Sequence, residues 1–220
     1  MNEFTFSYPI KVYFGQKAAV KAFAAELPKV GKNVMLAYGG GSVKQNGIYD
    51  EIKNLLVQFG KEVIDFPGIM PNPTYTKVQE GVALVRKHHV DFILAVGGGS
   101  VIDCCKVVSA QAKLDEDIWN MEYDAHKFPS ERIPMGAVVT ASGTGAEMNA
   151  GAFDTLSHAM ETYLGSSDMD NVSDDIALAV MRNTVVNMRR LLADMNDIQA
   201  RSNLMWDSAM AENGILKVGA

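Results

Sequence analysis

The sequence has few cysteines, no long hydrophobic run and no excess of basic residues. Its only two cysteines, Cys104 and Cys105, are adjacent, and neighbouring cysteines rarely form a disulfide bond. No CxxC pair is present, which argues against a structural zinc site and against a thiol redox motif. Two free thiols predict a reducing compartment, so we expect a cytoplasmic protein whose cysteines pack along a helix.

Charge and hydropathy argue against two further classes of partner. With 20 basic and 26 acidic residues the formal net charge is −6, which disfavours binding to nucleic acid or to an anionic membrane. The start of the chain, MNEFTFSYPIKVYFG, has neither the basic nor the apolar region of a signal peptide. The longest apolar run, around Phe92–Val96, is too short to span a bilayer. We therefore expect neither a nucleic-acid nor a membrane partner.

The first two thirds of the chain alternate between short apolar runs and helical periodicity. The apolar runs predict strands at Val34–Tyr38, Glu62–Phe66, Asp91–Val96 and Met135–Thr140. Helical spacing follows the first three of them, at 47–60, 74–89 and 100–113. This order predicts an α/β fold with a parallel sheet that is covered on both faces.

The character of the sequence changes after Gly151. Three segments with helical spacing follow, at 153–165, 173–195 and 197–213, and no strand candidate remains. We therefore predict two domains: an α/β dinucleotide-binding domain over residues 1–151, and an all-helical segment over residues 152–220.

Two nearly identical glycine loops follow strand candidates: LAYGGGSV begins at Leu36, and LAVGGGSV begins at Leu94. A glycine loop between a strand and a helix leaves backbone N–H groups free at the positive end of the helix dipole, where a phosphate can approach. In the second loop the expected donors are Gly98, Gly99 and Ser100, with Asp103 one turn into the helix. A tight turn without a ligand competes with this interpretation for one loop, and a second copy on the same sheet edge makes it less favourable.

The first loop comprises Gly39, Gly40, Gly41 and Ser42. Dinucleotide enzymes often place an acid near such a loop, where it accepts a hydrogen bond from the adenosine ribose and repels a 2′-phosphate. The run LAYGGGSVK contains no acid, and Ser42 and Lys44 are close by. This favours NADP over NAD, although Lys44 taken alone is equally well explained as a solvated lysine.

Two later motifs allow both a functional and a structural interpretation. The loop TASGTGAE supplies Thr140, Ser142 and Thr144, which fit the pyrophosphate and nicotinamide ends of a dinucleotide, or a turn that caps a helix. In FDTLSHAMETY, Asp154 and His158 are four residues apart and share one face of a helix, within reach of one metal ion. Catalytic sites need more than two ligands, so an Asp–His ion pair is the better interpretation from these residues alone.

Taken together, the motifs resemble the iron-containing (group III) alcohol dehydrogenases, within them the NADP-dependent butanol dehydrogenase branch. The matching segments are YGGGSVKQNGIYDEI, PNPTYTKVQEGV, AVGGGSVIDCCK, TASGTGAEMNAG, FDTLSHAMETY and SNLMW. The resemblance implies a dehydroquinate-synthase-like fold, with a Rossmann-like cofactor domain followed by a helical metal-binding domain. It implies reversible, metal-dependent hydride transfer between NADP(H) and a primary alcohol or aldehyde, such as butanol or butyraldehyde.

The resemblance also assigns residues. It implies that Gly97–Ser100 hold the pyrophosphate, that Asp103 supports this loop, and that Asn72 and the TASGTG hydroxyls contact the dinucleotide. It further implies that Asp154 and His158 are two of four protein ligands to a divalent metal, iron or zinc.

Two departures from the family pattern lead to a second hypothesis. The family's two other histidine ligands are expected downstream of SNLMW and are not reached. In addition, MNAG is followed almost directly by AFDTLSHAME, where the family has a few dozen further residues. We therefore expect an internally deleted and C-terminally truncated homologue. The alternative function is a catalytically incomplete NADP-binding module, and a homodimer is left open.

Overall fold

The computed structural model describes residues 10–13, 15, 17–121, 126–127, 129–140, 148–165 and 172–212, with the backbone alone at 148–154 and 212. The contacts divide the chain into two compact units, one spanning Lys11–Thr140 and the other containing the helices after residue 147. The first unit ends at Thr140, before the domain boundary at residue 151 that the sequence suggests. The domain boundary at residue 151 stays a prediction. Each unit has hydrophobic core residues of its own.

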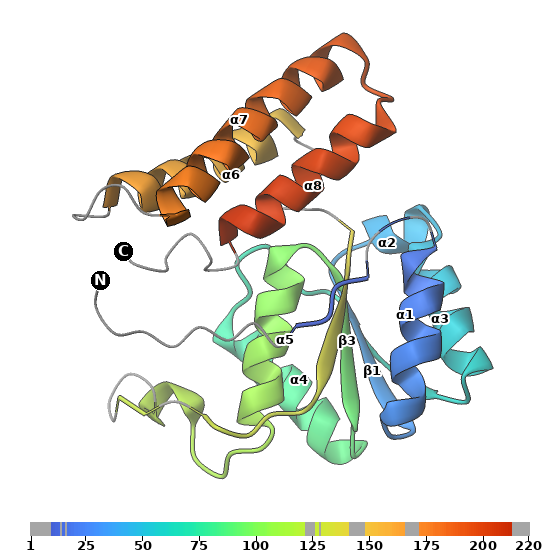
Figure 1. Ribbon diagram of the computed structural model, residues 1–220. Helices are drawn as coiled ribbons and strands as arrows, with labels where there is room; N and C mark the ends of the chain where they lie inside the picture. Colours follow the sequence, from blue (N-terminus) through green and yellow to red (C-terminus); the bar gives the residue numbers. More distant parts are fainter. Residues whose placement is uncertain are drawn as a thin grey trace. The chain divides into compact units, whose positions relative to one another are not determined.

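The first unit is built on a parallel sheet (Figure 1). Its strands are β1 (Asn33–Tyr38), β2 (Glu62–Phe66), β3 (Phe92–Gly97) and β4 (Met135–Val139). Its helices are α1 (Ala18–Glu26), α2 (Ser42–Gln45), α3 (Ile48–Gln58), α4 (Tyr75–Lys87) and α5 (Gly99–Gln111), with a 3-10 turn at Leu27–Lys29. The strand order is β2-β1-β3-β4. The predicted α/β class and the parallel sheet are confirmed, and α1 is an addition that the sequence analysis did not anticipate.

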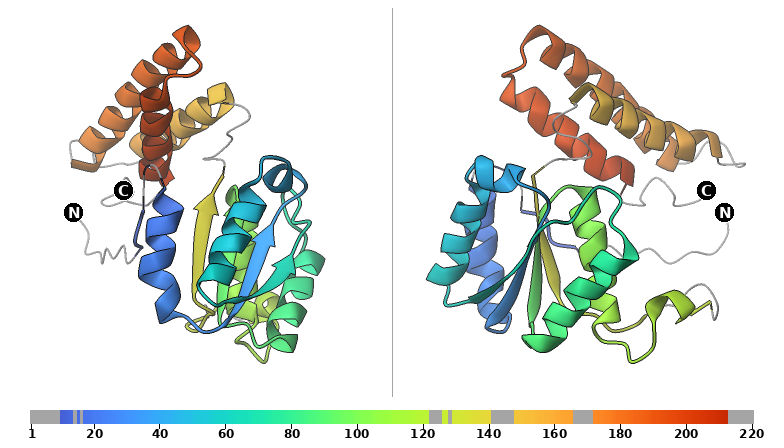
Figure 2. Two further views of the ribbon diagram at one scale, coloured as in Figure 1. Left: turned by 90° about the vertical axis from the view of Figure 1, so that its right-hand side faces the viewer. Right: turned by 180° about the vertical axis from the view of Figure 1, so that it is seen from behind.

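Helices cover both faces of this sheet, as Figure 2 shows from two further sides. Alternate residues of β1 enter different cores, because successive side chains of a strand point to opposite faces. Leu36 packs in a cluster that includes α1 and α3 residues, whereas Met35 packs in a cluster with α4 and α5. Both side chains are buried, which explains why the strand reads as a continuous apolar run.

The two cysteines lie in α5, inside the second of these clusters. Both are free and buried, as the sequence predicted for thiols packed along a helix. Burial raises the pKa of the Cys105 thiol to about 12, which keeps it protonated at neutral pH.

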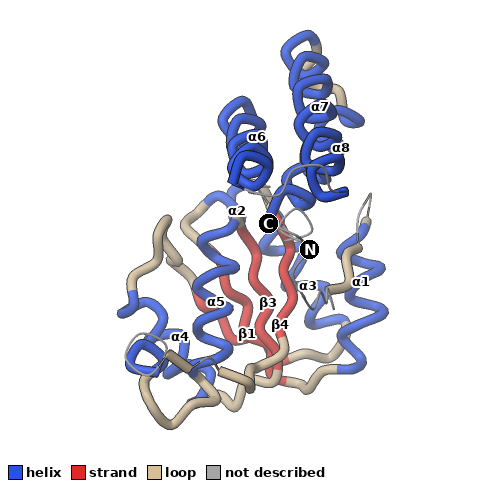
Figure 3. The backbone as a smooth tube through the Cα atoms, turned by 60° about the vertical axis from the view of Figure 1, so that its left-hand side comes forward, coloured by secondary structure: helices blue, strands red, loops and turns tan. Residues whose placement is uncertain are grey.

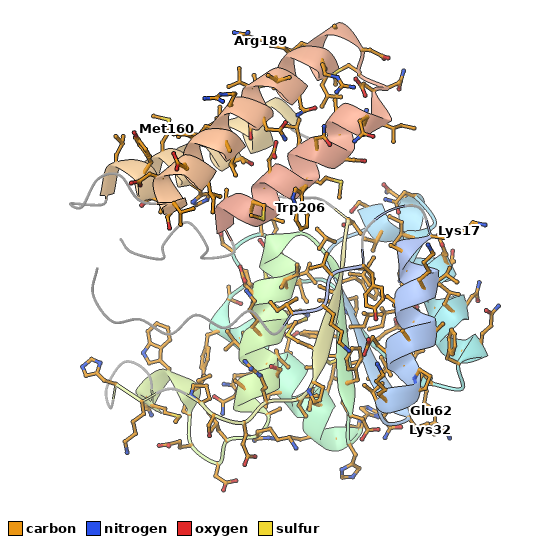
Figure 4. All side chains as sticks on the ribbon, in the orientation of Figure 1. Lys17, Lys32, Glu62, Met160, Arg189 and Trp206 are labelled. Carbon is orange, nitrogen blue, oxygen red and sulfur yellow. The ribbon has the colours of Figure 1, made fainter. Side chains whose placement is uncertain are left out.

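The second unit consists, in its described part, of helices alone: α6 (Met148–Gly165), α7 (Val172–Ala193) and α8 (Ile198–Glu212). Its apolar core is small, with Ala159, Ala177, Val180 and Ala211 buried. Several large apolar side chains are exposed, among them Trp206 (Figure 4). Across the described residues, no helix is both long and apolar enough to cross a membrane.

Polar residues between α7 and α8 supplement this small core. The Asp207 carboxylate is buried and accepts hydrogen bonds from the Asn183 amide at 2.8 and 3.0 Å and from the Thr184 hydroxyl at 3.3 Å. One turn along α7, Asn187 accepts a hydrogen bond from Asn203 at 2.9 Å. Because burial outweighs these bonds, the pKa of Asp207 is raised above its ordinary value.

The raised pKa predicts a pH dependence for the pairing of α7 with α8. The native state holds the Asp207 proton at a pH where the unfolded chain has already lost it, so stability falls as the pH rises from about 4 through the folded-state pKa. Asp207→Asn keeps an acceptor for Asn183 and removes the titration. We expect amide hydrogen exchange in α7 and α8 to be slower in the variant than in the parent protein at pH 7, with this difference shrinking toward pH 4. A difference that does not change with pH would contradict the prediction.

Candidate functional site

The carboxyl ends of three neighbouring strands meet at one edge of the sheet (Figure 3). Tyr38, the last residue of β1, pairs with Val96 of β3, and Gly97 pairs with Val139 of β4. The N–H of Thr140 donates to the carbonyl of Gly97 at 3.0 Å, so the ladder continues into the third loop. The structure therefore brings together both glycine loops and Thr140, whereas Ser142 and Thr144 lie outside the described residues.

The two glycine loops flank the topological switch point of the sheet. The chain leaves β1 toward β2 on one side and returns to β3 on the other, so the switch falls between β1 and β3. In open parallel sheets, ligands bind in the crevice outside the strand ends at such a point. The fold alone therefore marks the space next to both GGGS loops as the binding site to test.

The segment after β2 lies against the first glycine loop. The N–H of Gly68 donates to the carbonyl of Gly39 at 3.0 Å, and the N–H of Ile69 donates to that of Tyr38 at 3.2 Å. Asn72 follows in this segment, exposed and with a φ of 51°, a left-handed conformation that asparagine tolerates better than most residues. The sequence-predicted Asn72 is thus on the segment that borders the site, and its contact with a dinucleotide stays a prediction.

The second glycine loop has the geometry of an anion site. The carbonyl of Gly98 accepts from the N–H groups of Val101 and Ile102 at 3.1 and 3.3 Å, and this leaves those of Gly99 and Ser100 in the first turn of α5, without intrahelical partners. A Cβ at Gly97 would lie 2.6 Å from Val101 Cγ2, so packing itself requires a glycine there. A Cβ at Gly99 would meet nothing within 4 Å, so open space lies next to the free amides.

Asp103 lies one turn further along α5. Its side chain is 65% exposed, and its carboxylate is bonded to Lys106 at 3.0 Å. This ion pair places the carboxylate on the outer surface of the helix. The support of the glycine loop that the resemblance assigned to Asp103 stays a prediction.

The first glycine loop leads into the short helix α2. The carbonyl of Gly41 accepts from the N–H groups of Lys44 and Gln45, both at 3.0 Å. A Cβ at Gly39 would lie 3.2 Å from the carbonyl oxygen of Ile69, whereas one at Gly40 would meet nothing within 4 Å. Gly40, Gly41 and Ser42 are exposed, so this loop is open to a ligand along most of its length.

Lys44 is exposed, but the structure gives its ammonium group defined neighbours. Nζ lies 5.1 Å from the ring centroid of Tyr38 and 4.8 Å from that of Tyr49. The pKa of Lys44 is raised, chiefly by its hydrogen bond to Tyr38, so it is a cation at neutral pH. Lys44 is therefore an exposed lysine whose ammonium lies over two aromatic rings, and its contact with a 2′-phosphate stays a prediction.

An acid near the first loop was missed from the sequence. Asp65 is the penultimate residue of β2, next to β1 in the sheet, where it accepts from Tyr49 Oη at 2.8 Å and from Lys53 Nζ at 3.1 Å. The signal was available, because dinucleotide folds place an acid about 20 residues after the glycines, at the end of the second strand. The first loop itself contains no acid, as the preference for NADP requires, but Asp65 on the neighbouring strand is an acid that this argument overlooked.

The two metal ligands expected from the sequence both belong to α6. Asp154 and His158 lie four residues apart on that helix, but the Asp154 side chain is outside the described part of the structure. The His158 side chain is 45% exposed, and its Nδ1 lies 4.0 Å from Glu161 Oε2. No group of three or more potential His, Cys, Asp or Glu ligands occurs within the described residues. Two donors from one helix do not complete a catalytic metal site, which commonly has three protein ligands.

Two protein-family models match the chain. The model "iron-containing alcohol dehydrogenase" matches residues 9–171, which is more than half of the chain. The model "Fe-containing alcohol dehydrogenase family, C-terminal" matches residues 148–219.

Individual relatives agree with these matches. The NADH-dependent butanol dehydrogenase A of Clostridium acetobutylicum is 33% identical over 261 aligned positions, which cover all of this chain and 67% of the relative. The NADPH-dependent aldehyde reductase YqhD of Escherichia coli is 30% identical, with 67% of its length covered. The crystal structure of a butanol dehydrogenase A from Thermotoga maritima superposes with a TM-score of 0.88 at 29% identity, over all of this chain and 65% of that one.

The lengths in these comparisons bear on the expected deletion. The alignment with the Clostridium enzyme has 261 positions, whereas this chain has 220 residues, so roughly forty positions of the relative have no counterpart here. The chain spans about two thirds of the length of the relatives it matches. Fold, motifs and both family models agree, and the chain belongs to the iron-containing alcohol dehydrogenase family.

Proposed function

We propose that the chain binds NADP(H) at the switch point of its sheet, as the cofactor half of a dehydrogenase that interconverts a primary alcohol and its aldehyde. The observation that carries this proposal is the meeting of two glycine loops and Thr140 at one sheet edge, in a member of this family. Butanol and butyraldehyde are the substrates we propose, because several relatives are named butanol dehydrogenases. Family membership also supports iron, or zinc, as the metal.

The residues at this edge fit a dinucleotide. The N–H groups of Gly99 and Ser100 supply hydrogen bonds and partial positive charge for the pyrophosphate. Asn72 and Thr140 border the same edge and supply polar groups for the remainder of the cofactor. Ser142 and Thr144 belong to the same proposal on the resemblance alone. The cofactor when bound supplies the hydride, and these residues hold and orient it.

The choice between NADP and NAD depends on the adenosine end. The relatives differ, since the Clostridium enzyme is named NADH-dependent and the Escherichia coli enzyme NADPH-dependent. Lys44 supports NADP for this chain, because its ammonium stands at the end of the first loop and attracts a 2′-phosphate. We therefore place the 2′-phosphate next to Gly40, Gly41 and Ser42.

A second function is a nucleotide-binding module without turnover. It is favoured by the metal donors, because no group of three or more potential ligands occurs within the described residues, and Asp154 and His158 of α6 are two. In either case we propose a cytoplasmic protein with a small-molecule ligand, without a nucleic-acid or membrane partner. Size-exclusion chromatography tests whether the protein assembles as a homodimer.

An assay separates the two functions. NADPH binding is followed by the change in nicotinamide fluorescence, and turnover by NADPH oxidation with butyraldehyde, with and without Fe²⁺ or Zn²⁺. We expect NADPH binding in all conditions, and a dehydrogenase requires oxidation that a chelator abolishes and the metal restores. Binding without oxidation supports the module, and absence of binding contradicts both functions.

Gly99→Ala tests the assignment of the pyrophosphate. The added methyl meets nothing within the protein, and alanine is favoured over glycine in a helix, so folding stability should not fall. The methyl occupies space that a phosphate needs, and we expect affinity for NADPH to fall about tenfold, the equivalent of one charge-assisted hydrogen bond. Gly165→Ala, at the end of α6 and also in open space, is the matched control and should bind normally. Equal affinities in both variants would place the pyrophosphate elsewhere.

Gly40→Asp tests the assignment of the adenosine end. Gly40 is the better position than Gly39, where the new side chain would press on the carbonyl of Ile69. The added carboxylate repels a 2′-phosphate, so we expect the ratio of NADPH to NADH affinity to fall about tenfold. Gly40→Asn has the same size without the charge and should leave this ratio nearly unchanged. If both variants keep the parent ratio, the 2′-phosphate does not lie at this loop.

A further inference from the structure

A cluster of charged and aromatic residues lies next to the first glycine loop, all within the α/β unit. The charge cluster comprises Tyr38, Lys44, Tyr49, Lys53 and Asp65, from β1, α2, α3 and β2. Its formal charges are two cations and one carboxylate. A role for this cluster in cofactor choice rests on the proposed binding of the adenosine end at this loop.

One half of the charge cluster is a neutralised pair. Lys53 Nζ donates to Asp65 at 3.1 Å and to Tyr49 Oη at 2.7 Å, and Tyr49 Oη donates to Asp65 at 2.8 Å. The bond to Tyr49, followed by that to Asp65, raises the pKa of Lys53 to about 12, so the lysine remains charged. Asp65, the acid in the position where a dinucleotide fold would repel a 2′-phosphate, therefore has a cation against it.

The other half of the charge cluster is a cation on aromatic faces. The rings of Tyr38 and Tyr49 are 5.0 Å apart in an edge-to-face arrangement, and the ammonium of Lys44 lies about equally far from both. Aromatic faces attract a cation without cancelling its charge. Lys44 thus keeps its positive charge, which Asp65 attracts through space. Tyr49 contacts both halves of the cluster, through its ring and its hydroxyl.

We propose that Lys53 and Tyr49 are positioning residues that determine the cofactor preference of this site, Lys53 by neutralising Asp65 and Tyr49 by holding Lys44 next to the first glycine loop. With Asp65 neutralised and Lys44 held, the charge cluster has a net charge of +1 and accepts a nucleotide that carries a 2′-phosphate. Loss of Lys53 exposes Asp65 and brings the net charge to zero. A simple packing role for these residues would affect stability but not this preference.

Substitutions at Lys53 and Asp65 change the net charge of the cluster in steps, and the proposal predicts that the preference for a 2′-phosphate follows this charge. Lys53→Met brings the cluster to zero, Asp65→Asn brings it to +2, and the double substitution restores +1. The readout is the ratio of affinities for adenosine 2′,5′-bisphosphate and adenosine 5′-monophosphate, measured by calorimetry, because these probes differ only in the 2′-phosphate. We expect the ratio to fall about three- to tenfold in Lys53→Met, to rise in Asp65→Asn, and to return to the parent value in the double variant.

The matched control is the ion pair at the opposite edge of the same two strands. Lys32 precedes β1 and pairs with Glu62 at the start of β2, far along the strands from the glycine loops (Figure 4). Lys32→Met removes an equivalent lysine–carboxylate pair and should not change the ratio. If Lys53→Met behaves like Lys32→Met while the parent protein still prefers the bisphosphate, the inference is overturned and the proposed function stands.

Two substitutions of Tyr49 test its part in the proposal. Tyr49→Phe keeps the aromatic face for Lys44 and leaves the direct Lys53–Asp65 bond, so it should keep most of the preference. Tyr49→Leu removes one of the two faces, and we expect its ratio to fall part of the way toward that of Lys44→Met, because Tyr38 still contacts the ammonium. Equal ratios in the Phe and Leu variants would overturn the role of Tyr49. A parent protein that binds neither probe would overturn the proposed function itself, and circular dichroism confirms that each variant is folded.

Discussion

The parallel pairing of β1 with β3 is the constraint on which the site depends. The register places Tyr38 beside Val96, so the two glycine loops begin at the same level of the sheet. A slip by one residue would move each side chain of β1 to the other face, which would exchange the cores around Leu36 and Met35. Because both cores are filled by different helices, this slip is excluded by packing. The hydrophobic core therefore fixes the relative position of two loops that have almost no side chains of their own.

Much of this arrangement could be predicted from the sequence. A buried parallel strand that ends in glycines gives a strong local signal, and all of the strands expected from apolar runs are present, with ends shifted by at most one residue. The meeting of the loops also followed, since parallel strands present their carboxyl ends on one edge. The positions of Lys44 and Asp65 did not follow. Their side chains meet at Tyr49, a residue of α3 whose helical periodicity says nothing about the partner of its hydroxyl group.

The helical unit was less predictable for a physical reason. The periodicity of its segments indicated helices, and α6, α7 and α8 are present, but Val172 and Ser173 both lie within α7, which therefore starts slightly earlier than expected. Its interior is filled partly by amide, hydroxyl and carboxylate groups around Asp207, and such groups do not mark a buried face in a hydrophobic pattern. The placement of Asp154 and His158 on one helix followed directly from their spacing, whereas a full set of metal ligands requires elements that spacing does not reveal.

Lys53 and Lys44 show why composition is a poor guide to the potential of a site. The net charge of −6 describes the whole chain, yet in the charge cluster beside the first glycine loop one cation lies against a carboxylate and another lies on aromatic rings. The first contributes little to the field at the loop, because its partner cancels it over a distance shorter than the screening length. The second keeps its charge, because a ring quadrupole holds a cation without neutralising it. A local positive potential in an acidic protein therefore comes from the kind of partner each lysine has, and not from the number of lysines.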